Sequence, residues 1–118
     1  MAAVDLGKYF GARVIATVGT DAKLAVVKAR GADQVINYTL PDGSLGGFRD
    51  RVKALSDGEG ADVIFDPVGG EVFDESMRCL NWGARVVIVG FTAGRPALAK
   101  TNHILIKGAS VSGIRAGE

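Results

Sequence analysis

Thr20 and Lys23 lie just after an apolar run that ends at Gly19. Thr20 can cap a helix, and the free backbone N–H groups at a helix N-terminus attract anions. Lys23 adds an ammonium group in the first turn of that helix. No Asp or Glu ends this run, where an acidic residue would accept a hydrogen bond from a ribose hydroxyl. Thr20 and Lys23 together therefore favour the binding of a phosphate group over that of an unphosphorylated ribose. The alternative is that Thr20 only caps the helix and Lys23 is a solvated surface charge.

Other apolar runs also end in residues that could meet a ligand. Tyr38 could lie beside an adenine ring and reach a ribose phosphate, although a tyrosine at a strand end also fits simple edge packing. Asp66 could be a polar contact, but a turn aspartate that bonds its own backbone is the simpler interpretation. The pair Gly69-Gly70 and the later Gly90 would let a ligand approach the backbone closely.

The single histidine, His103, and the single cysteine, Cys79, are interpreted as structural. His103 has no acidic partner nearby in sequence, and Cys79 sits beside Leu80 on a predicted helix. One cysteine excludes an internal disulfide, and the sequence has no cluster with the spacing of metal ligands. A zinc site is therefore not expected.

These residues need a scaffold, and the chain alternates between short apolar runs and helical patterns. We expect strands at 12–18, 33–38, 61–65, 85–89 and 109–114, and helices at 1–10, 20–31, 48–55, 72–80 and 102–106. Strands separated by helices, without hairpin dipeptides, indicate βαβ crossovers and a parallel sheet. The predicted fold class is α/β, a doubly wound parallel sheet of the Rossmann type. Ligands bind such sheets outside the carboxyl ends of the strands, where the candidate residues fall.

The composition and net charge of the chain exclude some classes of binding partner. The chain has 118 residues, 47% hydrophobic and 23% charged, which suits one folding unit. Its 14 basic and 13 acidic residues give a net charge of +1, so nucleic acid and anionic membrane surfaces are not expected as partners. The longest apolar run is far shorter than a membrane helix, and no leader pattern is present. We expect a cytoplasmic protein.

Four segments carry a family resemblance. They are residues 14–20 (VIATVGT) with Lys23, 31–38 (GADQVINY), 66–70 (DPVGG) and 83–90 (GARVVIVG). In order and spacing they resemble the quinone oxidoreductases (zeta-crystallin-like) of the medium-chain dehydrogenase/reductase superfamily. The resemblance covers essentially the whole chain. It implies a Rossmann domain that binds NADP(H), without zinc, in an enzyme that passes hydride to a quinone or an enone.

The resemblance also implies roles for individual residues. Lys23 matches the lysine that holds the 2′-phosphate of NADPH, and Tyr38 matches the tyrosine beside it. The residues that match positions lining the cofactor are Val68 and Gly69, and those that match positions near the nicotinamide are Val89, Gly90 and Phe91. Gly19 and Thr20 belong to the same candidate site. No catalytic residue is assigned.

Two features of the family are missing from the sequence. No strand or glycine-rich fingerprint precedes the first helix, so the expected domain is a partial NADP(H)-binding Rossmann domain over residues 1–118. The catalytic domain is also absent, and the chain alone is expected to be inactive and to bind cofactor weakly. A homodimer through the strand at 109–114 is expected. The alternative is a truncated interaction or structural module with no nucleotide affinity.

Overall fold

The computed structural model describes residues 2–95 and 97–114. Its helices and strands alternate along the chain, and every pair of strands in its sheets is parallel. The predicted α/β class with parallel sheets is confirmed. The contacts divide the chain into two compact units, Met1–Phe48 (unit 1) and Arg49–Glu118 (unit 2), where length alone predicted a single folding unit.

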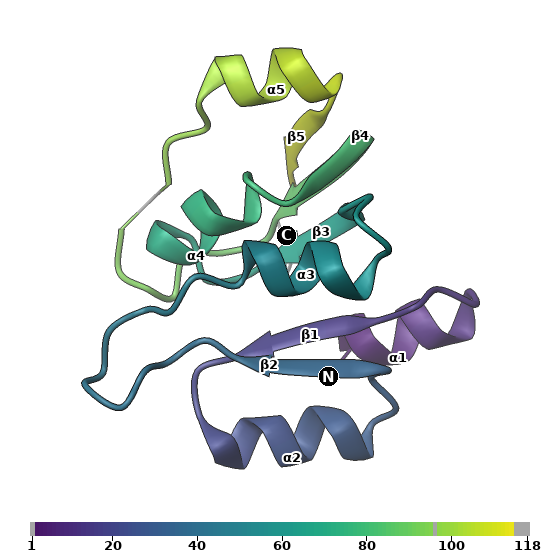
Figure 1. The fold of residues 1–118 in the computed structure, drawn as a ribbon, viewed down its shortest axis with the longest axis vertical. Helices are drawn as coiled ribbons and strands as arrows, with labels where there is room; N and C mark the ends of the chain where they lie inside the picture. Colours follow the sequence, from purple (N-terminus) through teal and green to yellow (C-terminus); the bar gives the residue numbers. More distant parts are fainter. Residues whose placement is uncertain (1, 96, 115–118) are drawn as a thin grey trace. The chain divides into compact units, whose positions relative to one another are not determined.

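Unit 1 is a two-stranded sheet with helices. Its elements are α1 (Ala2–Tyr9), β1 (Ile15–Val18), α2 (Asp21–Ala29) and β2 (Gln34–Asn37). Figure 1 shows β1 and β2 side by side, with Ile15 paired to Gln34 and Val18 to Asn37. The helix α2 joins the two strands, and its Val27 is buried. This is the βαβ crossover expected from the sequence.

The strand β1 begins three residues later than the sequence predicted. The N–H of Val14 donates to Asp33 Oδ2 at 2.8 Å, so a side chain and not a neighbouring strand satisfies it. The same carboxylate accepts from Lys8 Nζ at 2.9 and 3.0 Å, which ties α1 to the start of β2. Regular pairing therefore starts only at Ile15.

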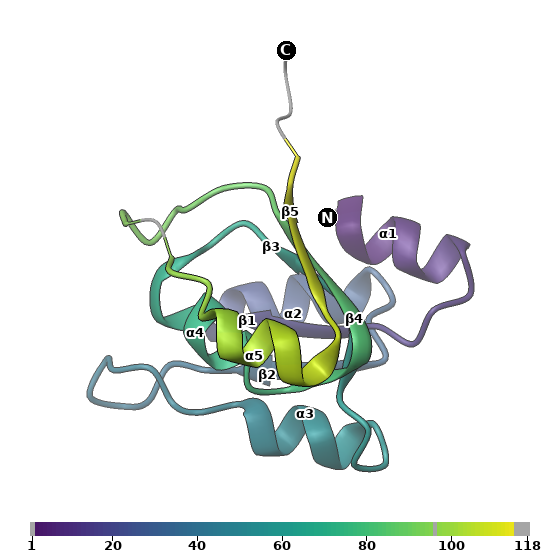
Figure 2. The same cartoon turned by 90° about the horizontal axis from the view of Figure 1, so that it is seen from above.

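Unit 2 is a three-stranded parallel sheet in the order β3-β4-β5. Its elements are α3 (Arg49–Leu55), β3 (Ala61–Asp66), α4 (Gly70–Ser76), β4 (Leu80–Ile88), α5 (Thr101–Lys107) and β5 (Ser110–Gly113). Figure 2 shows β5 beside β4, with α5 leading into β5. The helix α5 ends at Gly108, whose φ of 58° is left-handed.

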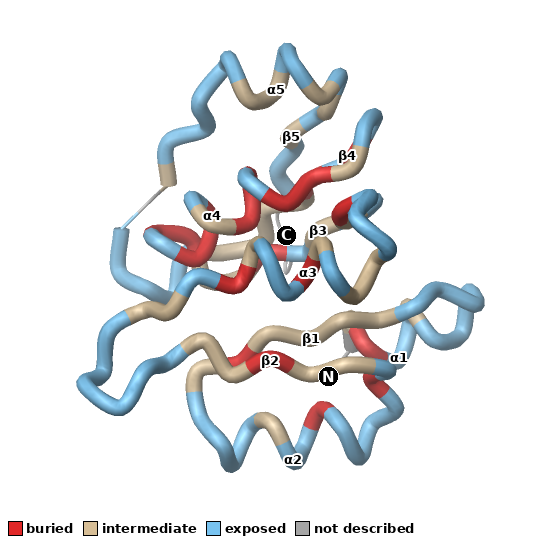
Figure 3. The backbone as a smooth tube through the Cα atoms, in the orientation of Figure 1, coloured by how far each residue is buried: buried red, intermediate tan, exposed pale blue. Residues whose placement is uncertain are grey.

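The core of unit 2 lies where α4 packs against β4. Its buried residues are Phe73, Met77, Leu80, Ala84 and Val86. Figure 3 shows many of the buried positions of this unit on these two elements, with others on α3 and β3. Ile104 from α5 packs against the same cluster.

The predicted helix at 72–80 is wrong at both ends. It begins at Gly70 and ends at Ser76, and Met77 is its C-cap. Leu80 was expected inward on the helix, and it is inward, with 1% of its surface exposed. It reaches the core from β4, where it pairs with Ala61. No helix within residues 2–95 and 97–114 is both long and apolar enough to cross a bilayer.

Candidate cofactor-binding site

Gly19 and Tyr38 lie next to each other at the carboxyl end of the unit 1 sheet. The Tyr38 N–H donates to the Val18 carbonyl at 3.0 Å, which extends the pairing of β1 and β2 by one residue. A Cβ added to Gly19 would lie 3.4 Å from the Tyr38 hydroxyl oxygen. The Tyr38 ring also faces Phe48 with a centroid distance of 6.2 Å. The structure thus brings together two residues that the sequence placed on separate strands.

Thr20 caps α2 as the sequence predicted. Its φ and ψ of −142° and 154° are extended, and its Oγ1 accepts from the Lys23 N–H at 3.2 Å. Lys23 is exposed in the first turn, and its ammonium takes part in no ion pair among the described residues. We call Gly19, Thr20, Lys23 and Tyr38 the β1–β2 cluster.

Asp21 and Asn37 are residues of this region that the sequence did not reveal. The amide of Asn37, at the end of β2, donates to Asp21 Oδ1 at 2.8 Å, and Asn37 Oδ1 accepts from the Thr39 N–H at 2.9 Å. A negative charge therefore lies in the same helical turn as Lys23. The only signal in the sequence was that Asp21 directly follows the helix cap Thr20. Nothing near Asn37 in the sequence indicated that it would bond Asp21.

In unit 2, Asp66 organises the turn after β3. Its Oδ1 accepts from the N–H groups of Val68 and Gly69 at 2.7 and 3.0 Å. This confirms the turn aspartate that the sequence favoured. The side chain is buried, with 2% of the residue exposed, and Oδ2 has no hydrogen-bond partner among the described residues.

The turns after β3 and β4 are joined by backbone hydrogen bonds. Thr92 and Ala93 donate to the carbonyls of Pro67 and Val68 at 3.1 and 2.9 Å. A Cβ on Gly90 would lie 3.1 Å from the Pro67 carbonyl oxygen, which is tighter than ordinary contact. The backbones of the two turns therefore approach so closely that a side chain at Gly90 would require Pro67 to shift by a few tenths of an ångström.

Gly69 is constrained in two ways. Its φ of 74° and ψ of −154° are accessible essentially to glycine alone. An added Cβ would also lie 3.2 Å from both Phe91 Cβ and the Arg95 carbonyl oxygen. Phe91 itself is 58% exposed at the rim of this turn. We call Val68, Gly69, Val89, Gly90 and Phe91 the β3–β4 cluster.

Cys79 and His103 do not join either cluster. The Cys79 thiol donates to the Ser76 carbonyl at 3.3 Å, and burial with the nearby charge of Glu75 raises its pKa to about 11. A thiol with this pKa is not a nucleophile at neutral pH. His103 is half-buried in α5. In residues 2–95 and 97–114, no three His, Cys, Asp or Glu side chains gather as metal ligands would.

Comparison with known proteins shows the family and the fold of the chain. Residues 1–118 match the family model described as zinc-binding dehydrogenase. Mouse quinone oxidoreductase-like protein 2 is 40% identical over 115 residues, which are 97% of this chain and 31% of that protein. The chain thus spans about a third of the length of this curated relative.

Two solved structures show the fold. An NAD-dependent alcohol dehydrogenase matches with a TM-score of 0.82 and 36% identity, over 97% of this chain and 32% of that one. The Escherichia coli quinone oxidoreductase complexed with NADPH matches with a TM-score of 0.76 and 30% identity, over 98% of this chain and 33% of that one. The chain belongs to the zinc-binding dehydrogenase family, within the medium-chain dehydrogenase/reductase superfamily, and has the fold of the nucleotide-binding domain of an oxidoreductase.

Proposed function

We propose that this chain is the NADP(H)-binding part of an oxidoreductase that reduces a quinone or an enone double bond. The observation that carries the proposal is the β1–β2 cluster. Lys23 offers an exposed ammonium in the first turn of α2, and Thr20 begins the same helix. The Tyr38 ring lies against Gly19 on the neighbouring strand end.

This donor set suits the 2′-phosphate of NADPH. A lysine ammonium binds phosphate oxygens with charge-assisted hydrogen bonds, and hydroxyl groups add further donors. A similar solved structure, the Escherichia coli quinone oxidoreductase, is a complex with NADPH. The residues that would hold the 2′-phosphate are Thr20, Lys23 and Tyr38. The β3–β4 cluster would hold the rest of the cofactor through backbone groups.

The test is a calorimetric titration of NADPH and NADH into the chain and into Lys23→Glu. We expect the wild type to bind NADPH more tightly. Lys23→Glu should lower NADPH affinity about tenfold or more, because a carboxylate repels the 2′-phosphate and removes one charge-assisted contact. Equal preference for the two cofactors in the variant and the wild type would contradict the proposal.

Lys28→Glu is the matched control. Lys28 is an exposed lysine in the last turn of the same helix, so this variant makes an identical change in net charge away from Thr20. Its NADPH affinity should stay within about twofold of the wild type at moderate salt, because exposed charges farther apart than a Debye length are screened.

A second candidate function for this chain is to bind NAD(H) as part of an oxidoreductase, and Asp21 favours it. A carboxylate near the end of this strand can accept from a ribose 2′-hydroxyl, and one matching structure is an NAD-dependent alcohol dehydrogenase. Asp21 already accepts from Asn37. Asp21→Asn separates the two candidates: it should weaken NADH and leave NADPH if the second is right, and strengthen NADPH if the first is right.

A bound NADPH supplies a hydride to the acceptor. In this proposal the residues of the two strand-end clusters only position the cofactor. We therefore expect no turnover by the 118-residue chain alone, and the acceptor would be held by a further part of a longer enzyme, in keeping with relatives about three times as long. If no nucleotide binds at all, the chain is an interaction or structural module instead.

Three further features belong to this proposal. The enzyme works without zinc, it is cytoplasmic, and two copies associate through the edge strand β5, predicted at 109–114 and present at Ser110–Gly113. The strand β5 pairs with β4 on one side, and three of its four residues are exposed. An edge of this kind accepts another strand. Sedimentation at micromolar concentration tests the dimer, and a sharp monomer would contradict it.

A further inference from the structure

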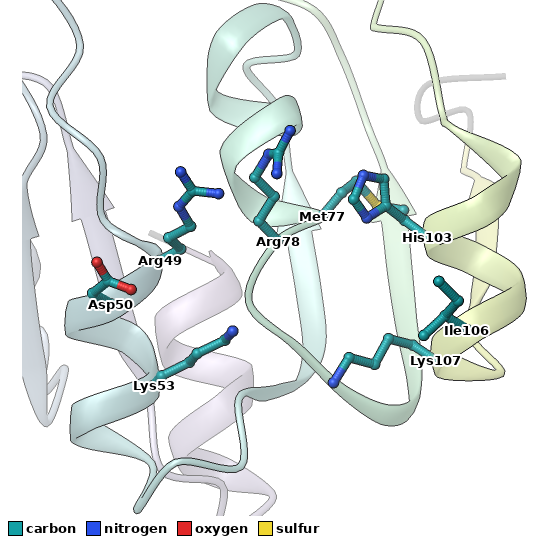
Figure 4. A pocket seen from close by; sticks show the side chains of 8 residues that line it. All are labelled: Arg49, Asp50, Lys53, Met77, Arg78, His103, Ile106 and Lys107. Carbon is teal, nitrogen blue, oxygen red and sulfur yellow. The ribbon is translucent and has the colours of Figure 1, made fainter.

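A pocket of about 440 Å³ lies within unit 2, among α3, the end of α4 and α5. Its lining residues are Arg49, Asp50, Lys53, Met77, Arg78, His103, Ile106 and Lys107. Figure 4 shows the ammonium groups of Lys53 and Lys107 pointing toward each other from opposite sides. In the same view Met77 and His103 lie side by side against one wall. None of the residues of the two strand-end clusters lines this pocket.

The pocket concentrates positive charge in a nearly neutral chain. Four of its eight lining residues are cationic and one is acidic, whereas the whole chain has a net charge of +1. The Arg49 Nε lies 3.7 Å from Glu75 Oε2, and the Arg49 N–H donates to the same oxygen at 2.9 Å. Among residues 2–95 and 97–114, no ion pair involves Lys53, Arg78 or Lys107.

Converging like charges repel one another and lower the stability of the fold. Lys53 lies on α3, Lys107 on α5 and Arg78 in the turn after α4, so their convergence is a property of the fold and not of a charged stretch of sequence. An anion in the pocket would remove this repulsion. An arginine and two lysines together supply the donors that a phosphate group accepts.

We propose that this pocket binds a small anion that carries two or more phosphate groups. Its volume of about 440 Å³ falls in the range of small-molecule sites. The shared chemistry is a polyphosphate, either free or as part of a nucleoside diphosphate. The lining of this pocket shares no residue with the site proposed for NADP(H).

Inorganic pyrophosphate is the probe. Calorimetry should show saturable binding to the 118-residue chain, and amide NMR shifts should move at α3, residues 77–78 and α5 and not at α2. Affinity should fall as salt rises from about 50 to about 200 mM, because the contacts are ionic. An ADP arm identifies the source: about tenfold tighter binding than pyrophosphate indicates a nucleotide, and equal binding a free polyphosphate.

The decisive variant is Lys53→Gln with Lys107→Gln. It should weaken pyrophosphate binding about tenfold or more, because each lost contact is charge-assisted. Lys53→Arg with Lys107→Arg keeps both charges and should retain binding within about threefold, which separates loss of charge from loss of folding. Lys28→Gln, an exposed lysine on α2, should bind as the wild type does.

Circular dichroism melts of all variants verify that they fold. The proposal is overturned if pyrophosphate does not saturate the chain at millimolar concentration, or if the two glutamine substitutions bind it as Lys28→Gln does. It is also overturned if the NMR shifts map to α2, because the ion would then occupy the site proposed for NADP(H).

Discussion

The two units position their strand ends by different means. In unit 1, exposed polar contacts accompany the buried apolar residues: Lys8 with Asp33, Arg30 with Asp5, and Asn37 with Asp21. Unit 2 relies on a buried apolar cluster and on a carboxylate, Asp66, that is itself buried. The two candidate clusters differ in a similar way. The β1–β2 cluster is made mainly of side chains, and the β3–β4 cluster mainly of backbone.

This difference suggests that the two clusters have different roles, one in ligand specificity and the other in the stability of the fold. At the proposed site, exposed side chains would select the charge of the ligand, and their replacement should leave the fold intact because surface ion pairs contribute little stability. Backbone held by buried groups determines the shape of a turn, and changes there act on stability first. We therefore expect substitutions in unit 2 to affect folding, and substitutions in the β1–β2 cluster to affect binding.

The largest effect is expected for Asp66→Ala. It leaves the N–H groups of Val68 and Gly69 without their acceptor in a buried turn, which costs about 4 kcal/mol. Urea unfolding measures the loss. The control is Asp42→Ala, since Asp42 also bonds a turn, with Ser44, but is exposed. Similar losses in both variants would contradict the difference between the units.

Cys79 should give unit 2 a dependence on alkaline pH. Its pKa is raised from 9.0 to about 11, so the unfolded chain loses the proton first as pH rises. The stabilisation from the neutral thiol is fully present below pH 9.0 and is lost as pH rises through about 11, by about 3 kcal/mol. Cys79→Ala should lack this component when the two proteins are unfolded in urea across that range. Parallel pH profiles would refute the assignment.

Gly69→Ala should destabilise the turn by about 2 kcal/mol, because alanine is strained at this φ and ψ. The matched variant is Gly113→Ala on β5, where an added Cβ meets nothing within 4 Å and φ is ordinary. Thermal unfolding compares them. If Gly113→Ala proves as costly as Gly69→Ala, strain is not the cause.

The smallest effect should appear in unit 1 at acid pH. The pKa of Asp33 is lowered from 3.8, first by the hydrogen bond from the Val14 N–H and then by Lys8. The stabilisation is therefore present above pH 3.8 and is lost as pH falls through the lower folded-state value. Asp33→Asn should remove it, as seen in amide exchange within α1 and β1. Salt should weaken it in the wild type. Identical acid unfolding of the variant would contradict it.

Local chemistry made part of this structure predictable. The Thr20 cap and the Asp66 turn depend on neighbours two or three residues away, and both are present. Short apolar runs that alternate with helical patterns predicted the parallel strands, because helices between strands indicate crossover connections. Within each sheet the strands follow one another in chain order, β1-β2 and β3-β4-β5.

Contacts between distant residues account for what the sequence did not reveal. The start of β1 depends on Asp33, 19 residues beyond Val14. Leu80 is inward both on the predicted helix and on the observed strand, so burial alone did not distinguish them. The cationic pocket combines side chains from α3, α5 and the turn after α4, and the sequences of these segments show only ordinary surface lysines and arginines.

The exposure of Lys23 has a consequence for how this protein changes over generations. Its ammonium makes no ion pair among the described residues, so at the proposed site a single codon change would alter cofactor recognition without a folding defect that selection would remove. Gly69 has no such freedom, because any replacement strains the turn. Cofactor preference should therefore be an evolvable trait of this scaffold, while the turn that supports it should remain fixed.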